Sequence, residues 1–531
     1  MDVRFAISSL TAGAGFFGRL PLYLLRRLSP EQARARIAER LQSRNERFLN
    51  RLRNDVYSHP EGVYYALLRH AGCEYGDIAA EVHANGIESA LRMLFRAGVW
   101  ISVDEFKGRK PVIRGTLHIE AGPERLRSPR ASHHVTGSSG GSRSSGTPVL
   151  FDLRFVRDCA TILATILWTR GGQNWVKADW ESPGGGARYR LIQLATFGSP
   201  PEAWFSQIHP EDPVVPATAR WNTKAMRLGG AVVGRPFPAP VHAPLSDPAA
   251  VVAWASRVLA SGRTPFLFTF PSSAVRCCLA AMDKGIDIAG TRFEMSGEPI
   301  TSACLATLAA AGCKAIPRYG SMEVGGIGYG CLNPEHSDDL HVLRDMLALI
   351  QAGPDGAGAE LPERALLITS LHPHSPFLFI NASMGDEACI DERDCGCALQ
   401  AVGWGPHVHS IRSFEKLTTL GVTFPSDELI SVLERMLPER LGGAPTSYQL
   451  VEFENGNGEP RLELRVHPAV GPLDDEAILR EFCSAVETIS SSSAARVRLW
   501  RDAQVLRVAR QPPVTSRVGK ILHIHRMGAL S

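Results

Sequence analysis

The sequence has no excess of charge of one sign. Lysine and arginine together number 57 and aspartate and glutamate 54, so the formal net charge is only +3. Domains that bind nucleic acid usually carry a pronounced basic patch or a high pI. The composition therefore argues against nucleic acid as a partner.

Long apolar runs are also absent. The most apolar stretch near the start, 16–28, is interrupted by Arg19, Pro21, Arg26 and Arg27, well short of the roughly 20 apolar residues that a membrane-spanning helix needs. We expect this segment to be a helix that packs on its own domain, with a segment lying on a membrane surface as the alternative.

The third feature that we expect to be absent is a secretory leader. We therefore expect a cytoplasmic protein whose eleven cysteines are free thiols or metal ligands rather than a disulfide framework. A chain of 531 residues is long enough for two or more domains.

The stretch 293–331 has features that suit nucleotide binding. A short apolar run leads into the turn 296–299, and the spacing of Leu305 and Leu308 predicts a helix that ends before Gly312. A second apolar run then precedes a loop that starts near Tyr319. Two loops that each follow a strand lie at the carboxyl edge of a sheet, which is where α/β proteins bind ligands.

This order of motifs resembles the adenylate-forming superfamily, specifically its phenylacetate-CoA ligase branch. There, a Gly-Glu-Pro turn and a Tyr-Gly-x-x-Glu loop surround the adenine and the magnesium ion. The resemblance implies that Tyr319 stacks on adenine and that Glu323 faces Mg²⁺. The nucleotide contacts that it implies for the two loops are Gly297, Glu298, Pro299, Tyr319, Gly320, Ser321 and Met322.

A Gly/Ser run at 136–148 is a candidate phosphate loop. Its backbone N–H groups and hydroxyls can surround a triphosphate, although a flexible linker has the same composition. Strand-like segments at 112–114 and 149–153 favour the loop. It resembles the family's loop with two departures, since it is longer and Val149 stands where many members carry lysine. Arg143 is a candidate for the missing charge. The implied contacts are Thr136, Ser138, Ser139, Gly140, Gly141, Ser142 and Arg143.

Two pairs of soft ligands form a candidate zinc site. Four nitrogen and sulfur ligands in a closed set are typical of structural zinc, and some members of the branch carry a similar set. The expected ligands are Cys331, His336, Cys395 and Cys397, with His341 and Cys389 as substitutes. Unliganded thiols are the alternative.

Three further residues continue the resemblance toward the C-terminus. Asp386 follows a strand-like run at 377–380 and resembles the aspartate that binds the ribose hydroxyls. Arg412 matches the ribose-binding arginine at the hinge, where Phe414 stands in place of the hinge aspartate and Glu415 is the nearest carboxylate. Lys520 resembles the mobile catalytic lysine that holds the substrate carboxylate and the α-phosphate.

The resemblance implies an α/β protein with a large N-terminal adenylate-forming domain of mixed sheets and flanking helices, and a small mobile α+β lid. We expect an N-terminal helical segment at 1–100, an adenylation domain that binds ATP and the acid at 101–412, and the C-terminal lid at 413–531.

The implied activity is ATP-dependent activation of an aryl or acyl carboxylic acid to an acyl adenylate, with release of pyrophosphate, and transfer to the thiol of coenzyme A. The implied cofactors are ATP, Mg²⁺, coenzyme A and structural Zn²⁺. Transfer to an amine or to a carrier-protein thiol in trans stays open, as does a non-catalytic nucleotide-binding protein. The sequence does not decide the oligomeric state, and a homodimer is one option.

Overall fold

The computed structural model of the chain describes residues 16, 18–131, 135–138, 148–182, 184–213, 215–359, 361–413, 417–419, 422–424, 426–444, 447–457, 459–514 and 524–526. Among these residues, no helix combines the length and the apolar character needed to cross a bilayer.

A twelve-stranded mixed sheet forms the centre of the large domain, in the order β13-β14-β15-β16-β12-β11-β10-β9-β8-β5-β6-β7. From β7 to β10 neighbouring strands are parallel, and from β10 to β13 they are antiparallel. The parallel strands are β5 (Val176–Glu181), β6 (Ala203–Ser206), β7 (Pro240–His242), β8 (Pro265–Thr269), β9 (Arg292–Met295) and β10 (Lys314–Ser321). The antiparallel strands are β11 (Gly325–Gly330), β12 (Leu340–Val342), β13 (Leu347–Gln351), β14 (Ala365–Ser370), β15 (Ala382–Glu392) and β16 (Pro406–Ser413).

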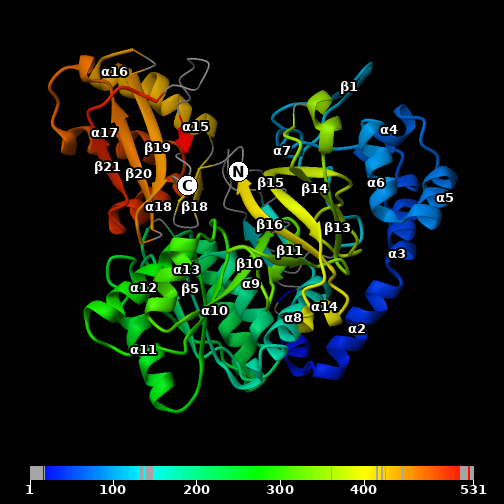
Figure 1. Cartoon of the computed structure of the whole chain (residues 1–531), viewed down its shortest axis with the longest axis horizontal. Coiled ribbons are helices and arrows are strands. Elements are labelled where there is room, and N and C mark those ends of the chain that lie inside the picture. The colour runs from blue at the N-terminus through cyan, green and yellow to red at the C-terminus, as the bar shows by residue number, and fades with distance from the viewer. Residues whose placement is uncertain are drawn as a thin grey trace.

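Helices connect the parallel strands and pack on this sheet (Figure 1). The predicted helix after the turn 296–299 is present, and Gly312 follows it with φ +67°, a conformation that favours glycine. The connecting helices are α9 (Gly185–Leu194), α10 (Ala217–Val232), α11 (Ala249–Ala260), α12 (Pro271–Asp283) and α13 (Ser302–Ala310), and α8 (Leu153–Trp168) precedes the first parallel strand, β5.

The N-terminal helices belong to the same hydrophobic core as the antiparallel half of the sheet. α2 begins with a capping box in which the Ser29 hydroxyl accepts from the Gln32 backbone, and it packs on α8. These helices are α2 (Pro30–Gln42), α3 (Arg44–Arg51), α4 (Val63–His70), α5 (Tyr75–Asn85), α6 (Ile87–Arg96) and α7 (Val103–Phe106).

A separate four-stranded sheet of order β21-β20-β19-β22 forms the C-terminal lid. Its strands are β19 (Tyr448–Glu454), β20 (Pro460–Val466), β21 (Leu506–Ala509) and β22 (Ile524–Arg526), and its helices are α15 (Ser426–Ser431), α16 (Leu437–Leu441), α17 (Asp475–Glu487) and α18 (Ser491–Asp502). Figure 1 shows this lid, in orange and red, next to α12 and α13. The predicted fold class is therefore confirmed.

One predicted strand is wrong. The apolar run 377–380 is an irregular segment with a single bridge between Phe377 and Arg127, and β15 begins only at Ala382. Phe377 and Phe379 instead pack edge-on against Phe106, with ring centroids 5.0 and 5.1 Å away. Burial of these rings, rather than strand pairing, accounts for the apolar run.

Candidate active site

Strand β10 lies where the parallel half of the sheet meets the antiparallel half. Its carboxyl end therefore opens at a switch in sheet topology, which is a common place for a ligand. The turn into β11 is tight, because a Cβ on Gly320 would collide with the carbonyl oxygen of Gly325. The Ser321 hydroxyl is buried there and has no hydrogen-bond partner among the described residues.

The structure brings Tyr319 and Asp386 together, although they are 67 residues apart. The Tyr319 hydroxyl donates to Asp386 Oδ2 at 2.8 Å. Burial and the Asp386 charge raise the pKa of Tyr319 well above its usual value, so the hydroxyl stays protonated and donates. The residues expected to contact adenine and ribose are thus neighbours at one end of β10.

Glu323 lies in the turn between β10 and β11 and forms an ion pair with Lys107, whose Nζ is 3.2 Å from Glu323 Oε1. Only 4% of the Lys107 side chain and 6% of the Glu323 side chain are exposed. Lys107 was not among the residues expected from the sequence. Its one signal was its place at the end of α7, just before the strand-like segment 112–114 that precedes the candidate phosphate loop.

The loop after β9 holds the predicted Gly-Glu-Pro turn. Gly297 has φ +89°, which favours glycine there. Glu298 accepts two hydrogen bonds from Ser272, at 2.8 Å from its backbone nitrogen and at 2.9 Å from its hydroxyl. The carboxylate therefore ties this loop to the first turn of α12, where a negative charge is favoured.

Arg412 is at the end of β16, next to β15, where it is paired in register with Glu387. Its guanidinium lies 3.5 Å from Asp338, which also accepts from the backbone of Ser410 and Ile411. Asp386 is one step further along the same strand pair, opposite Ser413. Arg412 and Asp386 therefore lie on neighbouring strands, β16 and β15.

The structure brings three of the predicted zinc ligands, Cys331, Cys395 and Cys397, close to the substitute His341. Cys331 Sγ lies 3.9 Å from Cys397 Sγ, and His341 Nε2 lies 3.1 Å from Cys397 Sγ and 3.6 Å from Cys395 Sγ. Tetrahedral zinc with bonds of about 2.3 Å to sulfur and 2.0 Å to nitrogen requires spacings of about 3.8 Å between sulfurs and 3.5 Å between sulfur and nitrogen. These side chains fit such a site.

The predicted ligand His336 lies apart from this cluster. Its ring stacks on His409 with centroids 3.8 Å apart, and it is the substitute His341 that lies beside the cysteines. Spacing alone favoured His336 because it shares a loop with Cys331, but β12 carries His341 back toward the cysteines. The other substitute, Cys389, accepts instead from Arg364.

His341 and His407 each present an Nε2 atom that could bind a metal ion. His341 Nδ1 lies 2.6 Å from the carbonyl oxygen of Trp404 and donates its proton to it, so Nε2 keeps a free electron pair for a metal ion. Burial and the neighbouring His407 lower the pKa of His341 to about 4, so the ring is neutral. His407 lies beside it, with Nδ1 held by Asp339 and with Nε2 buried and unpartnered among the described residues, so it is a further candidate ligand.

No family model matches the chain, and no curated protein matches it in sequence. Among solved structures, a 2-hydroxyisobutyryl-CoA ligase in complex with 2-HIB-AMP and CoA matches with a TM-score of 0.52 and 16% identity. The alignment covers 94% of this chain and 91% of that chain. The chain has the adenylate-forming fold. An o-succinylbenzoate-CoA synthetase from Bacillus subtilis has a TM-score of 0.40 and 11% identity, over 77% of this chain and 71% of that chain. An anthranilate-CoA ligase bound to anthranoyl-AMP has a TM-score of 0.33 and 12% identity, over 76% of this chain and 68% of that chain. Because both TM-scores are low, the assignment of the fold depends on the first structure.

Part of the expected site of this adenylate-forming fold lies outside the described residues. Strands β3 (Val135–Ser138) and β4 (Pro148–Phe151) form a hairpin that flanks the candidate phosphate loop, and β3 contains Thr136 and Ser138. Val149 is fully buried in β4, so its side chain faces the core. The expected residues outside the described part are Ser139, Gly140, Gly141, Ser142, Arg143, Phe414, Glu415 and Lys520.

Proposed function

We propose that the chain is an AMP-forming acid–thiol ligase that resembles the phenylacetate-CoA ligases. The observation that carries this proposal is the hydrogen bond between Tyr319 and Asp386, next to Glu323 at the carboxyl end of β10. In an adenylate-forming fold, this arrangement suits a nucleotide whose adenine and ribose lie against the strand end.

The reaction has two steps. In the first, a carboxylate oxygen of the acid attacks the α-phosphorus of ATP, an acyl adenylate forms and pyrophosphate leaves. In the second, the sulfur of coenzyme A, having lost its proton, attacks the acyl carbon and AMP leaves. Positioning and charge neutralisation are the main contributions that a protein makes to such steps.

The chain's own residues have distinct roles in this scheme. Asp386 would accept the ribose hydroxyls and hold Tyr319 in place through the hydrogen bond between them. Glu323, a buried carboxylate, suits a hard cation such as Mg²⁺, which neutralises phosphate charge when bound. Arg412 would contact the ribose from the hinge side. Lys520 would hold the acid and the α-phosphate in the first step and leave with the lid in the second.

The test is pyrophosphate release with Mg-ATP across a panel of aryl, cinnamic-type, fatty and hydroxy acids, with and without coenzyme A. We expect release to depend on one class of acid and a CoA thioester to accumulate. Formation of the adenylate without the thioester would indicate that the acceptor of the acyl group is an amine or a carrier-protein thiol and not CoA. Activity that is unchanged in Lys520→Ala would contradict the role of that lysine, and no release with any acid would contradict the ligase.

We also propose that Cys331, His341, Cys395 and Cys397 hold a structural zinc ion. The spacing of their sulfur and nitrogen atoms supports a closed set of four ligands, which leaves no open position for a substrate, with His407 as the alternative to Cys397. The ion would join the loop after β11 to the segment before β16, and it would thereby support the strands that present Tyr319 and Asp386.

A further inference from the structure

A cavity of about 960 Å³ lies outside the proposed adenylation site. The helical residues 18–25, the helices α2 and α3, the first half of α8 and the loop 372–374 surround it. None of the residues assigned above to ATP, the acid or zinc lines it. Its charged lining consists of Arg19, Arg26, Arg36, Arg40, Arg47, Arg154, Arg157, Glu39, Asp152 and Asp158.

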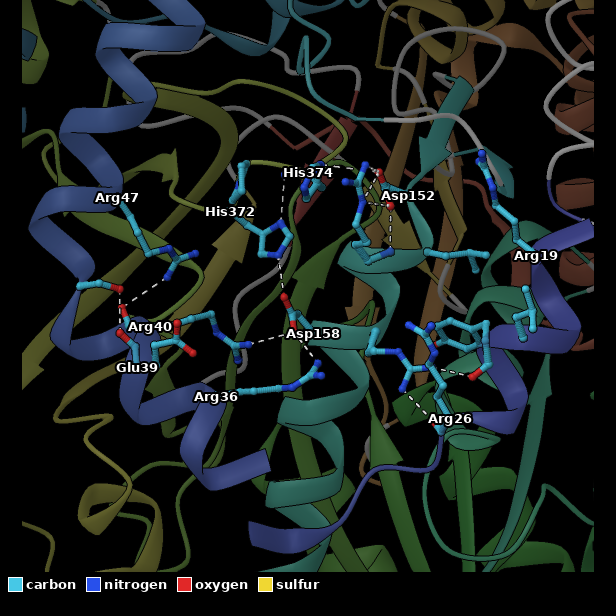
Figure 2. Close-up of a pocket in the computed structure, with 17 residues that line it drawn as sticks. Arg19, Arg26, Arg36, Glu39, Arg40, Arg47, Asp152, Asp158, His372 and His374 are labelled. Atoms are coloured by element: carbon cyan, nitrogen blue, oxygen red, sulfur yellow. Dashed lines mark hydrogen bonds and ion pairs between the residues drawn. The ribbon is translucent and has the colours of Figure 1, made fainter. Parts of the chain in front are cut away.

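The lining contains seven arginines and three carboxylates, and the buried carboxylate of Asp345 behind it pairs with Arg40 at 2.7 Å, so three positive charges remain in excess. Figure 2 shows the arginines on both sides of α8, with Asp158 between them. Most of the negative charge is already engaged. Asp158 lies within 3.1 Å of Arg40 and 3.6 Å of Arg36, and Asp152 is paired with Arg154. Glu39 is exposed.

Asp158 is fully committed to this network. It also lies 2.9 Å from His372 Nε2. Burial opposes its ionisation, but the His372 hydrogen bond and the Arg40 charge outweigh burial and lower the pKa of Asp158 to about 2. Burial lowers the pKa of His372 to about 4, so this histidine adds no charge at neutral pH.

Two arginines are held in place by carbonyl oxygens rather than by carboxylates. Arg47 donates to the carbonyl oxygen of Asp345 at 2.7 Å, and Arg157 donates to that of Arg26 at 2.8 Å and stacks on the Tyr23 ring. Burial and the Arg40 charge lower the pKa of Arg47 to about 10. Both guanidinium groups are therefore held in position, and the charges of Asp345 and Asp158 offset only part of the cost of burying the Arg47 cation.

Arg26 adds a third cation at the mouth of the cavity. Its side chain is exposed and has no carboxylate partner among the described residues. Guanidinium groups fixed in advance around a concave space match the oxygens of phosphate, with which they form paired, charge-assisted hydrogen bonds. An anion in the cavity would supply the missing negative charge.

We propose that this cavity binds the phosphate groups of a small molecule that carries at least two of them. Its volume is at the upper end of the range that holds such ligands. Two sources share this chemistry: a free inorganic di- or polyphosphate, and the phosphorylated nucleotide end of coenzyme A. The second source rests on the proposed function, and the first does not.

The test is calorimetric titration of the full chain in magnesium-free, low-salt buffer with inorganic pyrophosphate, coenzyme A and dephospho-coenzyme A. We compare wild type with Arg26→Glu and with Arg27→Glu, an exposed neighbour that does not line the cavity. We expect Arg26→Glu to weaken binding about tenfold, equal to about 1.4 kcal/mol, and Arg27→Glu to weaken it less than twofold. Binding should also weaken as salt is added.

The pattern of ligands identifies the source. Pyrophosphate binding that responds to Arg26→Glu assigns the cavity to free phosphates. Coenzyme A binding that responds to Arg26→Glu, with weaker binding of dephospho-coenzyme A, assigns it to the nucleotide end. No binding of either probe, or equal losses in the two variants, would overturn the proposal. Because no turnover is required, failure of the ligase assay would not affect this result.

Discussion

The ion pair between Lys107 and Glu323 connects a helix end to the turn after β10. Removing one partner of a buried pair leaves an uncompensated charge, which costs far more than the pair itself contributes. The pair therefore restrains the position of the carboxylate that we assign to the magnesium site.

Lys107→Met should lower the free energy of unfolding by about 3 kcal/mol, measured from urea denaturation. Adding Glu323→Gln should recover most of that loss, because a neutral amide no longer needs the cation. Lys110→Met is the matched control, since 70% of its side chain is exposed and its pair with Asp104 should contribute less than about 1 kcal/mol. Strictly additive losses in the double variant would show that the two side chains do not interact.

Lys177 is a second buried cation, in β5. Its Nζ donates to the carbonyl oxygens of Phe197 and Ser199, and burial lowers its pKa to about 7. An unfolded lysine titrates near 10.4. Between about pH 7 and pH 10.4 the unfolded chain therefore binds more protons at this site than the folded chain, so the free energy of unfolding should rise with pH there.

Lys177→Met should remove this rise, which for one group is at most about 1.4 kcal/mol per pH unit. The measurement is the urea unfolding free energy at pH 7.5, 8.5 and 9.5 for wild type and variant. Lys314→Met, at an exposed lysine in β10, should keep the wild-type slope. A Lys177→Met protein with an unchanged slope would refute the assignment.

Among the elements, the loop after β11 and the segment before β16 lie side by side and share the Cys/His cluster. Cys331 is in the first, Cys395 and Cys397 are in the second, and His341 reaches them from β12. Burial raises the pKa of Cys331 to about 12, so a metal would have to displace a proton that the thiol holds firmly.

Purified wild-type protein should contain about one zinc ion per chain by elemental analysis, and Cys397→Ser should contain almost none. The variant should also unfold at a lower temperature, because two loops lose their link. Cys73→Ser, a partly buried cysteine outside the cluster, should keep the metal. Wild-type protein that is active but contains no zinc would contradict the proposed structural zinc site.

At the scale of the whole molecule, the lid touches the large domain through several polar contacts. Arg276 in α12 lies 3.4 Å from Glu459 and donates to the carbonyl oxygen of Ala503 at 2.7 Å. Thr301 donates to Glu454 at 2.6 Å. Contacts of this kind stabilise one orientation of the lid and would have to break if the lid rotates between the two half-reactions.

Arg276→Met should therefore change the two half-reactions unequally, by about threefold or more in their ratio. Pyrophosphate release and thioester formation from preformed adenylate measure them separately. Arg498→Met is the control, since its pair with Asp212 crosses the same interface but 58% of the arginine side chain is exposed. Equal effects on both half-reactions would mean that the contacts do not select an orientation.

Features that depend on neighbouring residues in the chain were predictable. The α13 helix, the glycine at position 312 and the strands around the phosphate loop follow from apolar spacing and from backbone torsions, which are local properties. The order of the motifs likewise pointed to the adenylate-forming fold. The run 377–380 shows the limit of such reasoning, because apolar residues mark burial and not the hydrogen-bond partner.

Contacts between distant segments required the folded chain. His341 replaces His336 because β12 brings it back to the cysteines, and Lys107 reaches Glu323 across 216 residues. The arginine-lined cavity combines helices that are more than a hundred residues apart in the sequence. Packing of whole helices and strands sets these distances, and no local sequence pattern encodes them. The amino-acid sequence by itself therefore determines which ligand, charged and apolar side chains are available. The packed core determines which of these side chains come into contact.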